Sequence, residues 1–92
     1  MKNKLVYISD KYINTKLLRV KTCELSQSNP KACIINPKIA FSHLKSDEFM
    51  ENCLTLLDMC DEMWVVGEVC DANKYEIDYC REHKIPIRTV RR

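Results

Sequence analysis

Four short apolar runs, rich in β-branched and aromatic residues, constrain the fold of this chain more than any other feature. They cover residues 5–8, 32–35, 63–66 and 85–90. Each run is too short for a helix and has the composition of a buried strand. Longer segments with apolar residues at helical spacing separate the runs. This alternation predicts an α/β domain in which helices connect parallel strands.

Three segments between the runs have helical spacing, and they cover residues 13–26, 46–60 and 72–83. Ser46 precedes Asp47 and Glu48, which predicts an N-cap followed by acidic residues where the helix dipole favours negative charge. Asp71 is predicted to cap the last helix, and residues 38–45 are predicted to form a connecting loop.

The apolar spacing also predicts which side chains build the core. The residues expected to be buried are Ile13, Leu17, Leu18, Val20 and Leu25 in the first helix, Phe49, Cys53, Leu56, Leu57 and Cys60 in the second, and Tyr75, Ile77, Tyr79 and Cys80 in the third. Trp64 and the methionines Met50, Met59 and Met63 are expected in the core by ordinary burial preferences.

Placing the first strand centrally gives the order 2-1-3-4, so the connections leave this strand in opposite directions. Such a switch point is where open α/β sheets bind ligands, at the carboxyl ends of the strands. The sequence therefore predicts one domain over residues 1–92, an α/β fold with a four-stranded parallel sheet flanked by helices, Rossmann-like or flavodoxin-like. It places a site between the loops at residues 9–11 and 67–71.

The overall composition excludes several classes of function. A net charge of +2 gives no reason to expect a nucleic-acid or membrane partner, and 46% hydrophobic residues argue against disorder. No apolar run is long enough for a transmembrane helix or a secretory signal, so a cytoplasmic protein is expected. The basic end of the chain is interpreted as a solvated tail, formed by Arg88, Arg91 and Arg92.

A chain of 92 residues has a modest core, so a homo-oligomer is expected. The exposed apolar residues expected to favour association are Ile39, Ala40 and Phe41.

The six cysteines are predicted to be reduced and structural. None are spaced as C-x-x-C, and the two histidines, His43 and His83, lie far apart without a paired ligand. Several cysteines also fall on apolar stripes. The sequence therefore predicts buried thiols and no metal site.

Polar residues follow the first and third strands at the predicted site. They are Ser9, Asp10 and Lys11 after the first strand, and Gly67, Cys70 and Asp71 after the third. The chain has a single glycine, which argues against a glycine-rich phosphate loop, and no cofactor is predicted. Lys11 is either a point charge for a phosphate or a solvated lysine.

Glu76 lies near the amino end of the last helix, where the helix dipole favours the ionised carboxylate. A positioned carboxylate can act as a nucleophile at a sugar carbon. The alternative is an ordinary surface glutamate.

At these residues the chain resembles the nucleoside 2-deoxyribosyltransferase-like superfamily, and most of all its small uncharacterised bacterial and phage members. The resemblance covers residues 5–90 and is carried by the opening Val-Tyr-Ile-Ser-Asp-Lys-Tyr at 6–12, by Cys-Asp-Glu-Met-Trp-Val-Val-Gly at 60–67, by Glu-Ile at 76–77 and by Ile-Pro-Ile at 85–87. It implies that Tyr7 helps to hold a nucleoside, that Asp61 supports catalysis and that Glu76 attacks the anomeric carbon. It also implies sites completed across subunits.

Two loops depart from the family pattern. Ser9-Asp10-Lys11 stands where the family has small residues and often proline, and Asp10 would repel a phosphate lying there. Ala72 stands where the family has a glycine before the glutamate, and alanine is costly at positive φ. Tyr7 is either a core residue or a ligand contact, and Asp61 is either a turn residue or a ligand contact.

These departures favour a module that binds a nucleotide or nucleoside-derived molecule without turnover, sequestering a nucleotide signal. The alternatives are a nucleoside deoxyribosyltransferase or N-glycosidase with Glu76 as nucleophile, and a protein interaction module without a small ligand. A restored glycine at position 72 in close relatives would favour the enzyme, and loss of Glu76 there would favour the binder.

Overall fold

A computed structural model describes residues 3–10, 15–67, 69 and 71–90. These residues form the four predicted strands and the three predicted helices in the predicted order, and one short helix that was not predicted. The strands are β1 (Lys4–Asp10), β2 (Ala32–Ile35), β3 (Glu62–Val66) and β4 (Ile87–Val90), and the helices are α1 (Thr15–Ser28), α2 (Pro37–Ala40), α3 (Ser46–Met59) and α4 (Asp71–Glu82).

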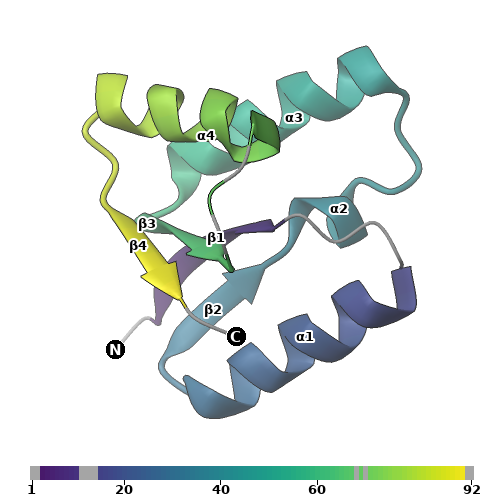
Figure 1. The fold of residues 1–92 in the computed structure, drawn as a ribbon, viewed down its shortest axis with the longest axis vertical. Coiled ribbons are helices and arrows are strands. Elements are labelled where there is room, and N and C mark those ends of the chain that lie inside the picture. Colours follow the sequence, from purple (N-terminus) through teal and green to yellow (C-terminus); the bar gives the residue numbers. More distant parts are fainter. Residues whose placement is uncertain (1–2, 11–14, 68, 70, 91–92) are drawn as a thin grey trace.

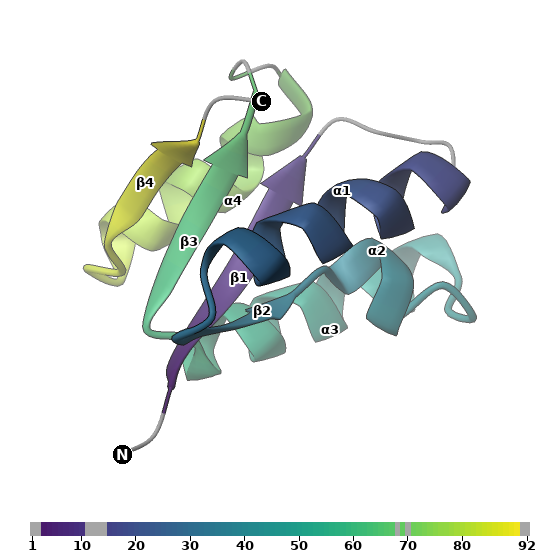
Figure 2. The ribbon, with the colours of Figure 1, turned by 90° about the horizontal axis from the view of Figure 1, so that it is seen from below.

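The four strands form one parallel sheet in the order β2-β1-β3-β4, which confirms the predicted fold class and topology. Helix α1 lies on one face of the sheet, and α3 and α4 lie together on the other (Figures 1 and 2). No helix in the described part of the chain is long and apolar enough to cross a membrane.

Strand β1 is the centre of the fold because it pairs on both sides and is buried on both faces. All five residues from Val6 to Asp10 are buried, so the polar pair Ser9 and Asp10 lies inside the strand rather than in the loop predicted to follow it. Ser9 pairs with Val65 and Asp10 pairs with Val66 of β3. The sheet thereby fixes the backbone of two predicted site residues.

Apolar side chains form a core on each face of the sheet. The core under α3 and α4 contains Tyr7, Cys53, Leu57, Cys60, Met63, Val65, Ile77 and Cys80. The core under α1 contains Val6, Ile8, Trp64 and Val66. Side chains alternate between the two faces along a strand, so β1 contributes Tyr7 to one core and its neighbours Val6 and Ile8 to the other.

Several predictions of burial are wrong because an edge strand or a surface helix buries only part of its apolar sequence. Strand β2 lies at an edge of the sheet, and Cys33 in it is exposed. Leu18 is buried in α1, whereas Leu17 and Val20 are exposed. Tyr75 of α4 is likewise exposed, and Ile13 lies outside the described residues.

The methionines divide in the same way. Met63 is buried in the sheet core, as Trp64 is, whereas Met50 and Met59 are exposed on α3. A strand in the middle of the sheet is covered on both faces, but a helix is covered on one side only.

The connection between β2 and α3 also differs from the predicted loop. Residues 37–40 form the short helix α2, and Phe41 packs against the core instead of forming an exposed apolar patch. Ser46 is the first residue of α3 rather than its N-cap, which is Lys45 without a side-chain hydrogen bond.

Candidate functional site

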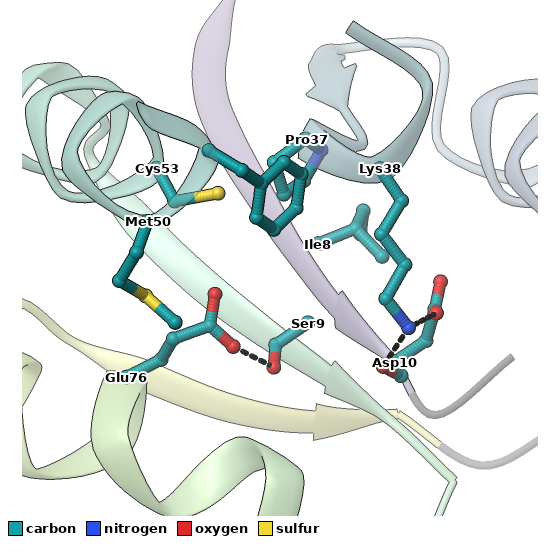
Figure 3. A pocket seen from close by; sticks show the side chains of 9 residues that line it. Ile8, Ser9, Asp10, Pro37, Lys38, Met50, Cys53 and Glu76 are labelled. Atoms are coloured by element: carbon teal, nitrogen blue, oxygen red, sulfur yellow. Dashed lines mark hydrogen bonds and ion pairs between the residues drawn. The ribbon is translucent and has the colours of Figure 1, made fainter. Parts of the chain in front are cut away.

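The carboxyl end of β1, the short helix α2, helix α3 and the amino-terminal half of α4 meet at a small cavity. It has a volume of about 90 Å³ and is lined by Ile8, Ser9, Asp10, Pro37, Lys38, Phe49, Met50, Cys53 and Glu76 (Figure 3). Ligand pockets commonly measure about 300–1,000 Å³, so this cavity fits one moiety of a larger ligand.

Glu76 is the central polar group of this cavity. Its side chain is partly buried, and its two carboxylate oxygens accept hydrogen bonds from two different residues of β1. Ser9 Oγ donates to Oε1 at 2.6 Å (Figure 3), and the Tyr7 hydroxyl donates to Oε2. Tyr7 and Ser9 are two residues apart on one strand, so both side chains point to the α4 face of the sheet.

Asn73 fixes the direction of the Ser9 hydrogen bond. Its side-chain amide donates to Ser9 Oγ at 2.7 Å, and Asn73 is 1% exposed. A serine hydroxyl has one hydrogen, so Ser9 accepts from Asn73 and gives that hydrogen to Glu76. Asn73 and Glu76 are three residues apart on α4 and therefore lie on the same side of the helix.

Burial opposes ionisation at this cluster. It raises the pKa of Glu76, although the hydrogen bonds from Ser9 and Tyr7 and the charge of Lys38 act in the opposite direction. The helix dipole was predicted to favour the ionised carboxylate of Glu76, and desolvation of this carboxylate acts in the opposite direction. Burial and the neighbouring Glu76 charge also raise the pKa of the Tyr7 hydroxyl, which keeps it a hydrogen-bond donor.

Cys53 of α3 completes this side of the cavity. Burial raises the pKa of its thiol, and the charge of Glu76 adds to this rise, although a hydrogen bond with Tyr7 lowers it. The thiol therefore stays protonated at neutral pH, as expected of a structural cysteine rather than a nucleophile.

Asp10 and Lys38 form an ion pair at the other side of the cavity. Lys38 Nζ lies 3.0 Å from Asp10 Oδ1 and donates to the Asp10 carbonyl oxygen at 2.7 Å (Figure 3). Asn36 donates to Asp10 Oδ2 at 2.9 Å. Asp10 is therefore a buried carboxylate paired with a lysine, so its expected repulsion of a phosphate is offset by the Lys38 charge.

The local sequence explains how Lys38 reaches Asp10. Asn36 is the N-cap of α2, where its side chain accepts a hydrogen bond from the backbone N–H of Lys38 at 3.0 Å, and Pro37 follows at the first helical position. Asparagine followed by proline is a helix-start signal, and it could have identified α2 and the position of Lys38. In the sequence the same two residues also follow the apolar run at 32–35, where they are typical of the end of a strand.

The structure brings together only some of the predicted site residues. Ser9, Asp10 and Glu76 line the cavity, and Tyr7 donates to Glu76. Three further polar residues take part that were not among the predicted site residues: Asn36, Lys38 and Asn73. Asn73 was detectable as a polar residue at helical spacing from Glu76.

Three other predicted residues lie elsewhere. Asp61 precedes β3 at the amino end of the sheet, where its carboxylate accepts a hydrogen bond from Leu5 N at 2.7 Å. Asp61 and Glu76 therefore lie at opposite ends of the strands. A hydrogen bond from a backbone N–H to the side chain is the contact expected of a turn residue. Gly67 ends β3 with φ of 86°, and Asp71 begins α4 on its exposed side.

Lys11 and Cys70 lie outside the described residues. Within the described part of the chain, no three His, Cys, Asp or Glu side chains gather as a metal site. The five described cysteines are free thiols, and Cys23 and Cys33 among them are exposed.

Comparison of the chain with protein-family models, with curated proteins and with solved structures gave no match in any of the three.

Proposed function

We propose that the cavity at Glu76 binds the sugar moiety of a nucleotide or nucleoside-derived molecule without turning it over. The observation that carries this proposal is the carboxylate of Glu76, held by hydroxyl donors at the switch point of the sheet. A carboxylate accepts about four hydrogen bonds, and the two hydroxyls of β1 use two of them. The remaining capacity suits the hydroxyl groups of a sugar.

The size and the walls of the cavity support the same assignment. A volume of about 90 Å³ takes one moiety, and the rest of the ligand would extend outward past the exposed side chain of Met50. The ion pair between Lys38 and Asp10 leaves this region with little net positive charge for a phosphate. Binding without turnover would sequester such a molecule, and we place this activity in the cytoplasm.

A second candidate is cleavage or transfer at an N-glycosidic bond, with Glu76 as the nucleophile. It is favoured by the fixed orientation of the carboxylate between Tyr7 and Ser9, because a nucleophile must be held within about 3–3.5 Å of the anomeric carbon. Two observations favour binding instead. Burial raises the pKa of Glu76, and Asp61, the expected supporting group, lies at the opposite edge of the sheet.

Glu76→Gln separates these functions, with Glu51→Gln on the exposed surface of α3 as the matched control. Each protein is incubated with nucleosides, nucleotides and cyclic nucleotides, while calorimetry measures affinity and chromatography detects free base. We expect binding without base release, unchanged in the control and weakened by about 1–3 kcal/mol in Glu76→Gln.

The other outcomes have defined meanings, provided that circular dichroism shows both variants folded. Base release by the wild type and the control, lost in Glu76→Gln, would establish the transferase or hydrolase. No binding by the wild type to any compound would reject both candidates and leave the protein interaction module.

A further inference from the structure

The exposed side of α4 carries a row of alternating charges. Asp71, Lys74, Asp78 and Arg81 follow one another at spacings of three, four and three residues. This spacing keeps them on one side of the helix. Along the row the signs are negative, positive, negative and positive.

The described residues form no ion pair with this row. Among the described residues, the ion pairs within 4.0 Å involve other side chains, and none of these four charged groups takes part. Two large apolar side chains on the same segment are also exposed, Val69 at 58% and Tyr75 at 57%. Val69, Ile77 and the four charged residues line an open hollow of about 340 Å³.

We propose that this side of α4 binds the same side of a second copy, with the two helices antiparallel about a two-fold axis near position 76. In that arrangement Asp71 faces Arg81 of the other copy and Lys74 faces Asp78. Both pairs are centred on position 76, so one axis serves them all, and every facing pair is opposite in sign. A parallel arrangement would place each charge against its own copy.

The charged and the apolar side chains contribute differently to the stability of the dimer. Solvent-exposed ion pairs contribute little affinity but select the orientation and register of a contact. Burial of Tyr75 and Val69 supplies the apolar contribution. A helix of 12 residues is about 18 Å long, so the contact is small and the dimer is weak and sensitive to salt.

This dimer is independent of the proposed ligand site. Glu76 points from α4 toward Ser9 of β1, away from the charged row, so the contact leaves the cavity open. The surface also differs from residues 39–41, whose apolar side chains were expected from the sequence to be exposed and to favour association.

Charge reversal with mutual rescue tests the antiparallel pairing. Lys74→Glu places like charges in both central pairs, and Asp78→Lys does the same with the opposite sign. A mixture of the two variants restores opposite charges in both central pairs of the heterodimer. A parallel arrangement would also pair opposite charges in the mixture, but it places like charges together in the wild type, so it predicts variants no weaker than the wild type and a mixture stronger than it.

The assay is analytical ultracentrifugation at low and high salt, with native mass spectrometry to distinguish the variants by mass. The wild type is expected to associate with increasing concentration, and less so in about 0.5 M salt than in about 0.02 M salt. Each variant alone should associate at least about tenfold more weakly, and their mixture should recover association. Lys16→Glu, an equal charge change on the exposed surface of α1, should behave as the wild type.

Three results would overturn the proposal. They are a wild type that stays monomeric at all concentrations, a mixture that associates no better than either variant alone, and variants that dimerise as the wild type does.

Discussion

Removing the hydroxyl of Tyr7 tests whether its hydrogen bond to Glu76 stabilises the fold. Tyr7 is 0% exposed, and its hydroxyl donates to the partly buried carboxylate of Glu76. A hydrogen bond to a charged group contributes about 1.5–3 kcal/mol. Tyr7→Phe should therefore lower the free energy of unfolding by about 2 kcal/mol at pH 8.

The expected change in melting temperature follows from the size of the domain. For a domain of this length, about 1 kcal/mol corresponds to about 4–8 °C, so Tyr7→Phe should lower the melting temperature by about 8–16 °C. Tyr79→Phe is the matched control, because it removes the same atom from a tyrosine that donates to Asp58 at 2.6 Å on the surface. The melting temperature of Tyr79→Phe should fall much less than that of Tyr7→Phe.

The pH dependence of this deficit has a definite sign. Burial raises the pKa of Glu76, so this group stabilises the fold fully below its unfolded-state pKa, and that stability is lost as the pH rises through the folded-state pKa. The Tyr7 hydrogen bond opposes the rise in pKa. Its removal raises the pKa of Glu76 further, so the deficit of Tyr7→Phe should grow between about pH 4 and pH 8.

Thermal unfolding followed by circular dichroism at a series of pH values measures both effects. Equal deficits for Tyr7→Phe and Tyr79→Phe, or a Tyr7→Phe deficit that shrinks as the pH rises, would refute the assigned role of the Glu76 carboxylate.

Three further predictions concern single side chains. Lys38→Met should lower the free energy of unfolding, measured by urea titration, by about 1–3 kcal/mol, because it removes the cation from the buried carboxylate of Asp10. The control Lys4→Met breaks an exposed ion pair and should lower it by less than about 1 kcal/mol. Equal losses in the two variants would contradict this prediction. In the native protein a thiol reagent should modify Cys23 and Cys33 quickly and the three buried described thiols only after unfolding, and all six thiols should be free in denaturant. Gly67→Ala should cost about 1–2 kcal/mol from backbone strain alone, because φ is 86° and an added Cβ meets no atom within 4 Å; an unchanged unfolding midpoint would count against this strain.

The order of the strands and their neighbours in the sheet could be predicted from the sequence. Short β-branched runs separated by helical spacing leave few topologies once right-handed crossovers are required. Ser9 and Asp10 at the carboxyl end of β1 were likewise selected because polar groups converge at that end of a parallel sheet. Local pattern and general chain chirality are sufficient for both predictions, whereas the choice of Glu76 also depended on the resemblance to the nucleoside 2-deoxyribosyltransferase-like superfamily.

Exposure at the edges of the sheet could not be predicted in the same way. Cys33 and Leu17 are as apolar as residues in the core, yet both are exposed. Their exposure depends on which strand has a neighbour on each side and on how much of each helix the sheet covers. Sequence spacing specifies a face of an element but not what lies against it.

The contacts of the candidate site were decided by the tertiary structure. Tyr7 and Glu76 are 69 residues apart, and only the packing of α4 on β1 brings their side chains together. The parallel pairing of β3 with β1 places Asp61 at the opposite end of the strands, although the resemblance had grouped it with Glu76. The sequence by itself determined the residue types and the sheet edge at which they converge, because these depend on local periodicity. Which carboxylate is held by hydroxyl groups and which is paired with a lysine depends on distances between elements, and only the folded chain determines those.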